Sequence, residues 1–218
     1  MTVTPDSVQS LLASADHGDR FRGINQLRLL DPAIAFELLQ TVVADKNPRV
    51  RYAALSQMGT LGTQDRQKAA TILRDHLLND DDTDVKSAAA DALGALQIRE
   101  AFADLKQLYE GTNEWLIQLS IVSVLGSLGE PEAFSLLASA LNSETELVQT
   151  MAISALGELG DRRAIELLIP LADHYDWQMR HRVAQSLAQL GGEEVKSTLN
   201  RLAQDSVEVV ANVAKEGL

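Results

Sequence analysis

The sequence contains no cysteine among its 218 residues, which excludes disulfides, thiolate metal sites and a cysteine nucleophile. For the same reason, no ligand can be attached to this chain through a thioether bond. Histidines are few, and His17, His76, His174 and His181 lack the i, i+4 spacing of a helical metal site. We therefore expect no metal centre.

Basic residues are outnumbered, with 19 Lys and Arg against 31 Asp and Glu, so the formal net charge is −12. Proteins that bind nucleic acids usually carry a basic surface, so no nucleic-acid partner is expected. No apolar run approaches the roughly 18 residues that a membrane span needs. The N-terminus also lacks the basic and apolar regions of a secretory signal. These features predict a soluble cytoplasmic protein that does not insert into a membrane.

One sequence pattern occurs five times along the chain. Each copy is an amphipathic segment that carries a small residue near its end. The small residues are Gly59, Gly94, Gly126, Gly157 and Ala188, which are 35, 32, 31 and 31 residues apart. Apolar residues recur at positions −9, −5, −1 and +2 from each small residue, as on one face of an α-helix. A regular period of this length indicates a solenoid of stacked repeats.

Another helix is expected before each copy of this pattern, because proline, glycine and N-cap residues interrupt the chain there. These additional helices are predicted at Ala33–Ala44, Asp65–Leu78, Ala101–Glu110, Glu132–Leu141, Arg163–Ala172 and Glu193–Ala203. The recurring helices themselves are predicted to begin at Asn47, Asp82, Glu114 and Asp176. Segments Phe21–Leu30 and Val207–Leu218 fit a divergent first repeat and a truncated last repeat. No segment has the pattern of a β-strand.

The recurring pattern places Val, Arg, Ala and Gly at fixed distances, as in Val50, Arg51, Ala54, Gly59 and Gly62. It resembles the short HEAT-like repeat of phycobilin lyases and their relatives. Longer matches are similar to phycobilisome degradation proteins, which are homologues of the E/F-type phycocyanobilin lyases. These matches are Val3–Val8, Arg22–Arg28, Asn47–Ala54, Glu114–Leu116 and Asp176–Ala184.

Together, the repeats and the resemblance predict an all-α fold, a right-handed α-solenoid of about seven HEAT-like helix pairs forming a single domain over residues 1–218. The resemblance implies a role in disassembly of the phycobilisome, the light-harvesting antenna in the cyanobacterial cytoplasm. It implies phycobiliproteins such as phycocyanin or allophycocyanin as partners, and phycocyanobilin as a ligand bound noncovalently. No familiar catalytic motif is present, so lyase activity stays open. The alternative is a non-enzymatic HEAT-repeat scaffold that binds protein partners.

The candidate ligand-binding residues lie on the second helix of each pair, on the face opposite its core positions. They are Tyr52, Asp91, Trp115, Leu119, Trp177, His181 and Arg182. Aromatic faces suit the conjugated rings of a bilin, and arginine suits its propionates. The best-placed group for catalytic proton transfer is His181. The alternative for each tryptophan is that it covers the entry to its helix and packs on the preceding loop.

Local clusters of basic residues suggest a partner-binding role for Arg49, Arg51 and Arg180. The alternative is structural, because Arg51, Lys86 and Arg180 occupy the same repeat position and could pair with acids between repeats. The acidic run Asn79–Asp84 lacks the spacing of a calcium-binding loop. We expect it to be a solvated loop that caps the next helix.

Overall fold

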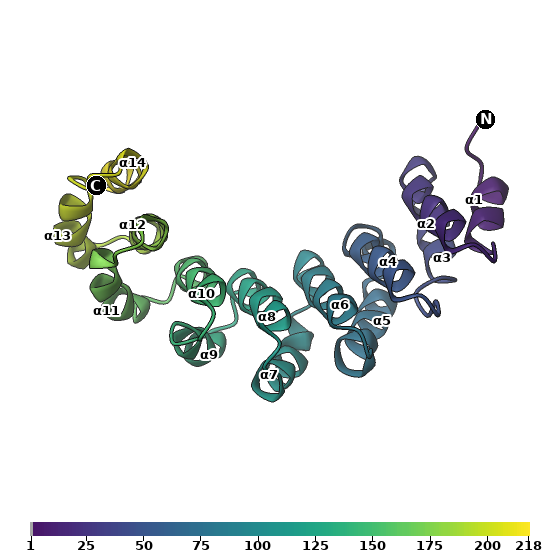
Figure 1. Ribbon diagram of the computed structural model, residues 1–218, viewed down its shortest axis with the longest axis horizontal. Helices are drawn as coiled ribbons and strands as arrows, with labels where there is room; N and C mark the ends of the chain where they lie inside the picture. The colour runs from purple at the N-terminus through teal and green to yellow at the C-terminus, as the bar shows by residue number, and fades with distance from the viewer. Residues whose placement is uncertain (1) are drawn as a thin grey trace. The chain divides into compact units, whose positions relative to one another are not determined.

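The computed structural model describes residues 2–218, and within this range the chain is all-helical, with fourteen α-helices and no β-strand (Figure 1). The helices follow one another as pairs, which confirms the predicted all-α fold of seven helix pairs. Contacts divide the chain into two compact units, one ending at Ile121 and one beginning at Val122. The prediction of one domain over residues 1–218 stays a prediction.

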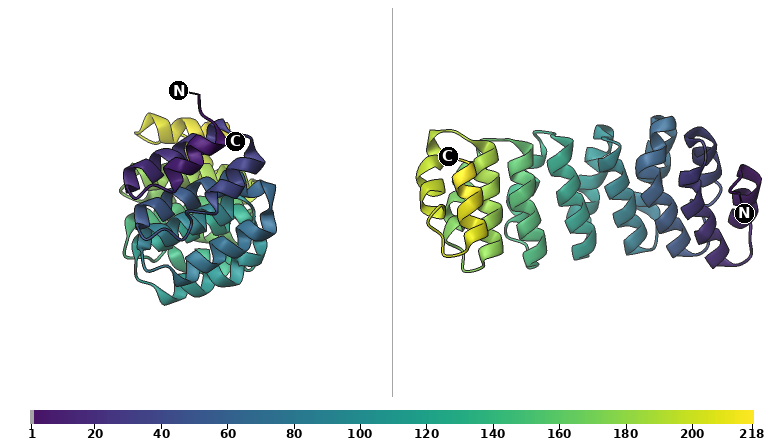
Figure 2. Two further views of the ribbon diagram at one scale, coloured as in Figure 1. Left: turned by 90° about the vertical axis from the view of Figure 1, so that its right-hand side faces the viewer. Right: turned by 90° about the horizontal axis from the view of Figure 1, so that it is seen from above.

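The first unit contains seven complete helices and the start of α8. These helices are α1 (Pro5–Leu12), α2 (His17–Gln26), α3 (Pro32–Leu39), α4 (Pro48–Leu61), α5 (Arg66–Asn79), α6 (Thr83–Ala95), α7 (Phe102–Gly111) and α8 (Trp115–Leu128). The second helices of successive pairs pack side by side, since α4 contacts both α2 and α6 (Figure 2). In α4, Val50, Ala54, Met58 and Leu61 are buried, at the four spacings that the repeated pattern predicts.

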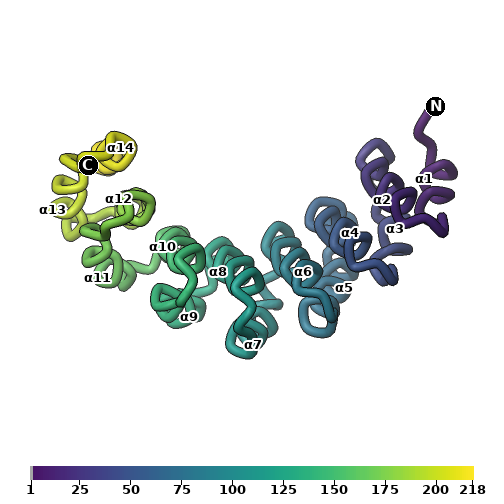
Figure 3. The backbone as a smooth tube through the Cα atoms, in the orientation of Figure 1, coloured from purple at the N-terminus to yellow at the C-terminus, as the bar shows by residue number. Residues whose placement is uncertain are grey.

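The second unit contains the end of α8 and six further helices (Figure 3). They are α9 (Ala133–Ala140), α10 (Glu146–Leu159), α11 (Ala164–Leu168), α12 (Trp177–Leu190), α13 (Glu193–Leu202) and α14 (Glu208–Glu216). Helix α12 contacts both α10 and α14, which repeats the arrangement of second helices in the first unit. Buried Val148, Ala152 and Leu156 give α10 the same apolar stripe.

The recurring small residue allows neighbouring second helices to approach closely. A Cβ atom on Gly126 would lie 2.7 Å from the Cα of Ala155, and one on Gly157 would lie 2.7 Å from the Cβ of Ser186. Both distances are too short for any side chain. A glycine inside a helix costs roughly 1 kcal/mol relative to alanine, and this packing explains its retention.

The first helix pair differs from the sequence prediction. Helix α1 was not predicted, although Thr4 and Ser7 form a capping box around it and Pro5 stands in its first turn. Helix α2 begins at His17, four residues before the expected start at Phe21, because Asp16 caps it. The divergent first repeat is therefore a complete pair.

In two of the pairs, the first helix is shorter than predicted. Helix α3 ends at Leu39, where the β-branched run Thr41–Val43 lowers helix propensity. Helix α11 ends at Leu168 and continues as the 3₁₀ turn Ile169–Asp173, because Pro170 has no backbone N–H to donate.

Three predicted N-caps are confirmed, since the side chains of Asn47, Asp82 and Asp176 each accept a hydrogen bond from a first-turn backbone N–H. None of the helices in residues 2–218 combines the length and the apolar character that a membrane span requires.

Candidate functional site

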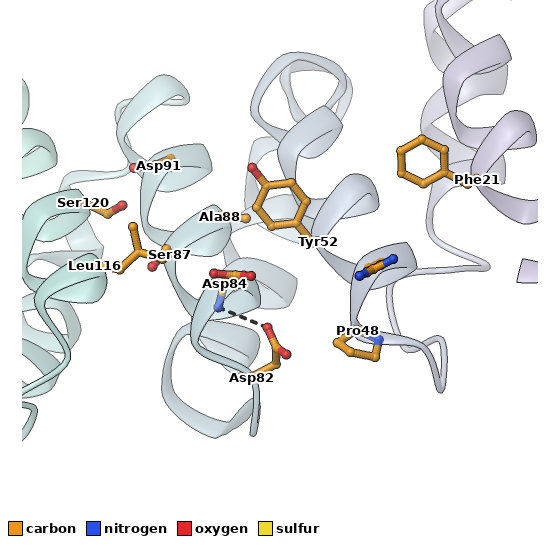
Figure 4. Close-up of a pocket in the computed structure, with 11 residues that line it drawn as sticks. Phe21, Pro48, Tyr52, Asp82, Asp84, Ser87, Ala88, Asp91, Leu116 and Ser120 are labelled. Atoms are coloured by element: carbon orange, nitrogen blue, oxygen red, sulfur yellow. Dashed lines mark hydrogen bonds between the residues drawn. The ribbon is translucent and has the colours of Figure 1, made fainter. Parts of the chain in front are cut away.

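A pocket of about 490 Å³ opens on the first unit (Figure 4). Its walls come from α2, α4, α6, α8 and the loop before α6. The lining residues are Phe21, Pro48, Arg49, Tyr52, Asp82, Asp84, Ser87, Ala88, Asp91, Leu116 and Ser120. Small-molecule sites in proteins occupy roughly 300–1,000 Å³, so the pocket has room for an organic ligand.

Two aromatic side chains form part of the pocket wall. Tyr52 of α4 and Phe21 of α2 are 46% and 43% exposed, so much of each ring is available to a ligand. They follow Arg51 and Arg20, which occupy equivalent positions in successive repeats. The sequence prediction included Tyr52 and missed Phe21, although the Arg20-Phe21 pair repeats Arg51-Tyr52 and could have revealed it.

The α6 and α8 side of the pocket carries polar groups (Figure 4). Ser87 and Asp91 lie one turn apart on α6, so they share a face. Burial raises the pKa of the Asp91 carboxyl, and a hydrogen bond with Ser120 of α8 offsets part of that rise. The Asp91 side chain is open to the pocket, whereas Ser87 is 4% exposed and its Oγ has no hydrogen-bond partner among the described residues.

The two other acids of the pocket belong to the start of α6. The carboxylate of Asp82 accepts hydrogen bonds from the backbone N–H groups of Asp84 and Val85, at 3.0 and 3.2 Å. Asp84 stands in the first turn, where the helix dipole favours a negative charge. Asp82 thus caps α6 as predicted, whereas Asp80 of the same run is buried, so the run is not the solvated loop that we expected. No group of three or more His, Asp or Glu side chains in residues 2–218 is arranged to hold a metal ion.

The pocket brings together three of the residues singled out from the sequence. Tyr52 and Asp91 were predicted to bind a ligand, and Arg49 to bind a partner; all three line the pocket. Arg49 is exposed and lies in the first turn of α4. Their roles in binding stay predictions.

Trp115 and Leu119 begin α8, and they do not line the pocket. Trp115 is 45% exposed and Leu119 is half-buried. The same helix contributes Leu116 and Ser120 to the pocket instead. The roles of Trp115 and Leu119 in ligand binding stay predictions.

The remaining predicted residues lie on α12 in the second unit. Trp177 is 42% exposed, and His181 follows it by one turn. Burial lowers the pKa of His181, and the positive charge of Arg182 lowers it further. His181 is therefore neutral near pH 7 and can accept a proton. The Arg182 side chain is exposed and donates to Oε1 of Gln185 at 3.2 Å.

Arg51 and Arg180 form the ladder that was the alternative to partner binding. Arg51 donates to both carboxylate oxygens of Asp80, at 2.8 and 2.7 Å, and Arg180 donates to both oxygens of Asp205, at 2.6 and 3.0 Å. Each arginine also donates to the backbone carbonyl six residues earlier, in Asp45 and His174 respectively. Lys86 departs from the ladder and donates to the carbonyl of Leu78 in the last turn of α5, at 3.4 Å.

The acid at the centre of the first-unit ladder is strongly ionised. Asp80 is buried, which raises its pKa, but hydrogen bonds from Arg51, from the backbone of Asp82 and from His76 prevail and lower it to about 2. The Nδ1 atom of His76 lies 2.9 Å from Oδ2 of Asp80. Every oxygen of this carboxylate is therefore used in holding repeats together.

Comparison with known proteins places the fold. No protein of curated function matches the sequence. The complex of CpcE and CpcF of phycocyanin lyase from Nostoc sp. PCC7120 contains a chain that matches with a TM-score of 0.67 and 23% identity, over 100% of this chain and 87% of that chain. YibA of Escherichia coli matches with a TM-score of 0.62 and 13% identity, over 99% and 92%.

An engineered protein gives a TM-score of 0.62 and 18% identity, over 99% of this chain and 67% of its own. At identities this low, these likenesses show the fold alone. The HEAT-repeat family itself matches residues 4–94, 70–150 and 136–218, which together span almost the whole sequence. The chain therefore belongs to the HEAT-repeat family.

Proposed function

We propose that this chain binds phycobiliproteins and binds or detaches their phycocyanobilin chromophore, as a phycobilisome disassembly factor of the NblB type in the cyanobacterial cytoplasm. Two lines of support come from the sequence resemblance to E/F-type lyases and from the likeness to a structure described as phycocyanin lyase. The observation that carries the proposal is the pocket of the first unit, because its chemistry matches the parts of a linear tetrapyrrole.

A bilin offers flat conjugated rings, two propionates and several ring N–H groups. The rings fit against Tyr52 and Phe21, whose exposed faces line the pocket. Arg49 supplies a forked donor for a propionate. Asp91 and Ser87 supply acceptors for ring N–H groups, and both lie across the pocket from Pro48 (Figure 4).

The proposed mechanism forms no covalent bond between this chain and the pigment, since the chain has no cysteine and no nucleophile motif. Detachment is then an elimination, in which the C–S bond breaks, the adjacent carbon of the bilin loses a proton to form a double bond, and the cysteine sulfur leaves as a thiol. The pocket holds the tetrapyrrole noncovalently while the phycobiliprotein is bound. His181 and Trp177 belong to the second unit, and their roles as proton acceptor and ring contact are proposed for a bilin bound to that unit by itself.

Titration of the full chain with phycocyanobilin tests the proposal. We expect the long-wavelength absorbance to intensify and shift to the red as the pigment is held in an extended form. Tyr52→Ala should weaken this change about tenfold, because an aromatic contact and its buried area are lost. Tyr175→Ala is the matched control, since Tyr175 is 80% exposed and lies outside the pocket. An unchanged spectrum at saturating pigment would refute bilin handling.

The scaffold alternative is favoured by a different surface. Four apolar side chains are exposed near the N-terminal ends of α10, α12 and α14 in the second unit: Leu147, Tyr175, Trp177 and Val209. Such a surface binds a partner protein without any pigment. Equal capture of phycobiliprotein subunits with and without their chromophore, lost on Leu147→Ser, would favour the scaffold.

A further inference from the structure

The clearest unexplained feature of the pocket is Asp91, an acid that pairs with no basic side chain. Asp91 is held by Ser120 alone, and no cation of the described residues pairs with it. Two buried acids of the first unit are each paired with a cation, Asp80 with Arg51 and Asp45 with Arg20. Asp91 is exposed to the pocket and has no cation of the described residues beside it, so its carboxylate is available to a cation from outside.

A second, independent observation lies one turn away on the same face of α6. The hydroxyl of Ser87 is buried and lacks any partner, although buried hydroxyl groups in folded proteins are almost always hydrogen-bonded. Two other buried serines of second helices have partners: Ser186 donates to the carbonyl of Ile153 at 2.9 Å, and Ser120 is hydrogen-bonded with Asp91. Ser87 lines the pocket, so a ligand bound there is a candidate partner for its hydroxyl.

The charge of the whole lining points the same way. It contains Asp82, Asp84 and Asp91 against a single basic residue, Arg49. Asp82 and Asp84 are explained by the start of α6, but their charges still make the pocket negative. Tyr52 adds an exposed ring whose face attracts cations.

We infer that the α6–α8 side of this pocket is a subsite for a planar organic cation with N–H donors, which Asp91 and Ser87 bind as acceptors. The class includes amidinium and guanidinium groups and protonated ring nitrogens. The inference goes beyond the proposed function, because it concerns which charge the pocket selects and holds for any occupant. Were the occupant a bilin, it would bind with its ring nitrogens protonated.

Three probes of the same shape and different charge test this selection in the full chain. Benzamidine is a planar cation, benzamide is its neutral counterpart and benzoate is the anion. We expect calorimetric titration to give benzamidine about tenfold higher affinity than benzamide, with benzoate weakest. A short arginine-containing peptide, compared with its citrulline counterpart, tests whether a cation carried by a protein is also accepted. Equal affinities for benzamidine and benzamide would overturn the inference.

Substitutions assign the effect to the subsite. Asp91→Asn should reduce benzamidine affinity about tenfold and leave benzamide affinity unchanged, and Ser87→Ala should reduce it a few-fold. Glu37→Gln is the control, because it removes a charge from an exposed position on α3 outside the pocket. Arg49→Gln should maintain or increase benzamidine affinity.

An Asp91→Asn variant that binds benzamidine as tightly as the wild type would reject the subsite. The absorbance titration with phycocyanobilin separates this result from failure of the proposed function. A chain that binds the bilin and shows no preference for benzamidine overturns the inference alone. Preference for benzamidine without any bilin binding supports the inference and overturns the proposed function.

Discussion

Asp80 and Asp91 lie close together in the sequence, yet the first unit treats them in opposite ways. Asp80, in the loop before α6, is hydrogen-bonded by Arg51, His76 and a backbone N–H, and these bonds lower its pKa to about 2. Asp91, on the open face of α6, receives only Ser120, and its pKa rises. One acid joins repeats, whereas the other faces a pocket.

The contrast separates residues that hold the repeats together from residues that have no structural role in the fold. In the loop before α6, Arg51 donates to Asp80 and also to a backbone carbonyl. In the pocket, the buried hydroxyl of Ser87 has no partner among the described residues, and Asp91 is bound by Ser120 without a cation. Polar groups that lower the stability of the fold and serve no structural purpose are expected at functional sites.

The largest effect should come from removing the ion pair between Arg51 and Asp80. Arg51→Met removes the partner of a carboxylate whose side chain is 4% exposed, which leaves a buried charge unpaired. We expect the free energy of unfolding to fall by about 3 kcal/mol, measured by urea denaturation.

The control for this loss is an ion pair of similar chemistry at the surface. Arg74 pairs with Asp104, but the Arg74 side chain is 44% exposed. Arg74→Met should therefore cost about 0.5 kcal/mol. Similar losses in the two variants would mean that burial does not set the strength of the loop pair.

Acidification should remove the same stabilisation without a mutation. The folded-state pKa of Asp80, about 2, lies below its ordinary value of 3.8, so ionised Asp80 stabilises the fold. This contribution, about 2 kcal/mol, is fully present above about pH 4 and is lost as the pH falls toward 2. Unfolding free energies measured across this range should show the loss in the wild type and not in Asp80→Asn. Parallel curves would contradict the assignment.

Much of the fold could be predicted from the sequence, because its causes are local. The apolar spacing within each copy sets the buried face, and N-caps such as Asn47 and Asp82 set where helices begin. Helix α1 escaped prediction because it is short, and its capping box of Thr4 and Ser7 replaces the acidic caps used elsewhere. The end of α3 likewise depends on weak propensities.

The candidate site could be predicted only in part. Tyr52 and Asp91 were found because they lie on the second helix of their pairs, on the face opposite its core positions. Ser87 was missed, since nothing in a sequence shows that a hydroxyl lacks a partner. The pocket also needs side chains from four helices, so that Phe21 and Ser120 meet in space only after the repeats stack.

A pair of serine variants sharpens the comparison at a smaller scale. Ser87 and Ser186 are both buried on second helices, but only Ser186 has a hydrogen bond, to Ile153. Ser186→Ala should lower the free energy of unfolding by about 1 kcal/mol, whereas Ser87→Ala should leave it unchanged or raise it slightly. Thermal and urea unfolding of the two variants measure the difference. Equal losses would show that Ser87 has a structural partner.

The smallest effect is also the one that distinguishes a site acid from a structural acid. The raised pKa of Asp91 means that its ionised form opposes folding at pH values above that pKa, and the opposition disappears as the pH falls below 3.8. Asp91→Asn should therefore raise stability slightly at pH 7 and have no effect near pH 3, while Glu37→Gln changes neither. Unfolding at the two pH values measures this. A loss of stability at pH 7 would make Asp91 a structural residue like Asp80. A gain, together with weaker benzamidine binding, would mean that the chain retains Asp91 for its ligand at the expense of its own stability.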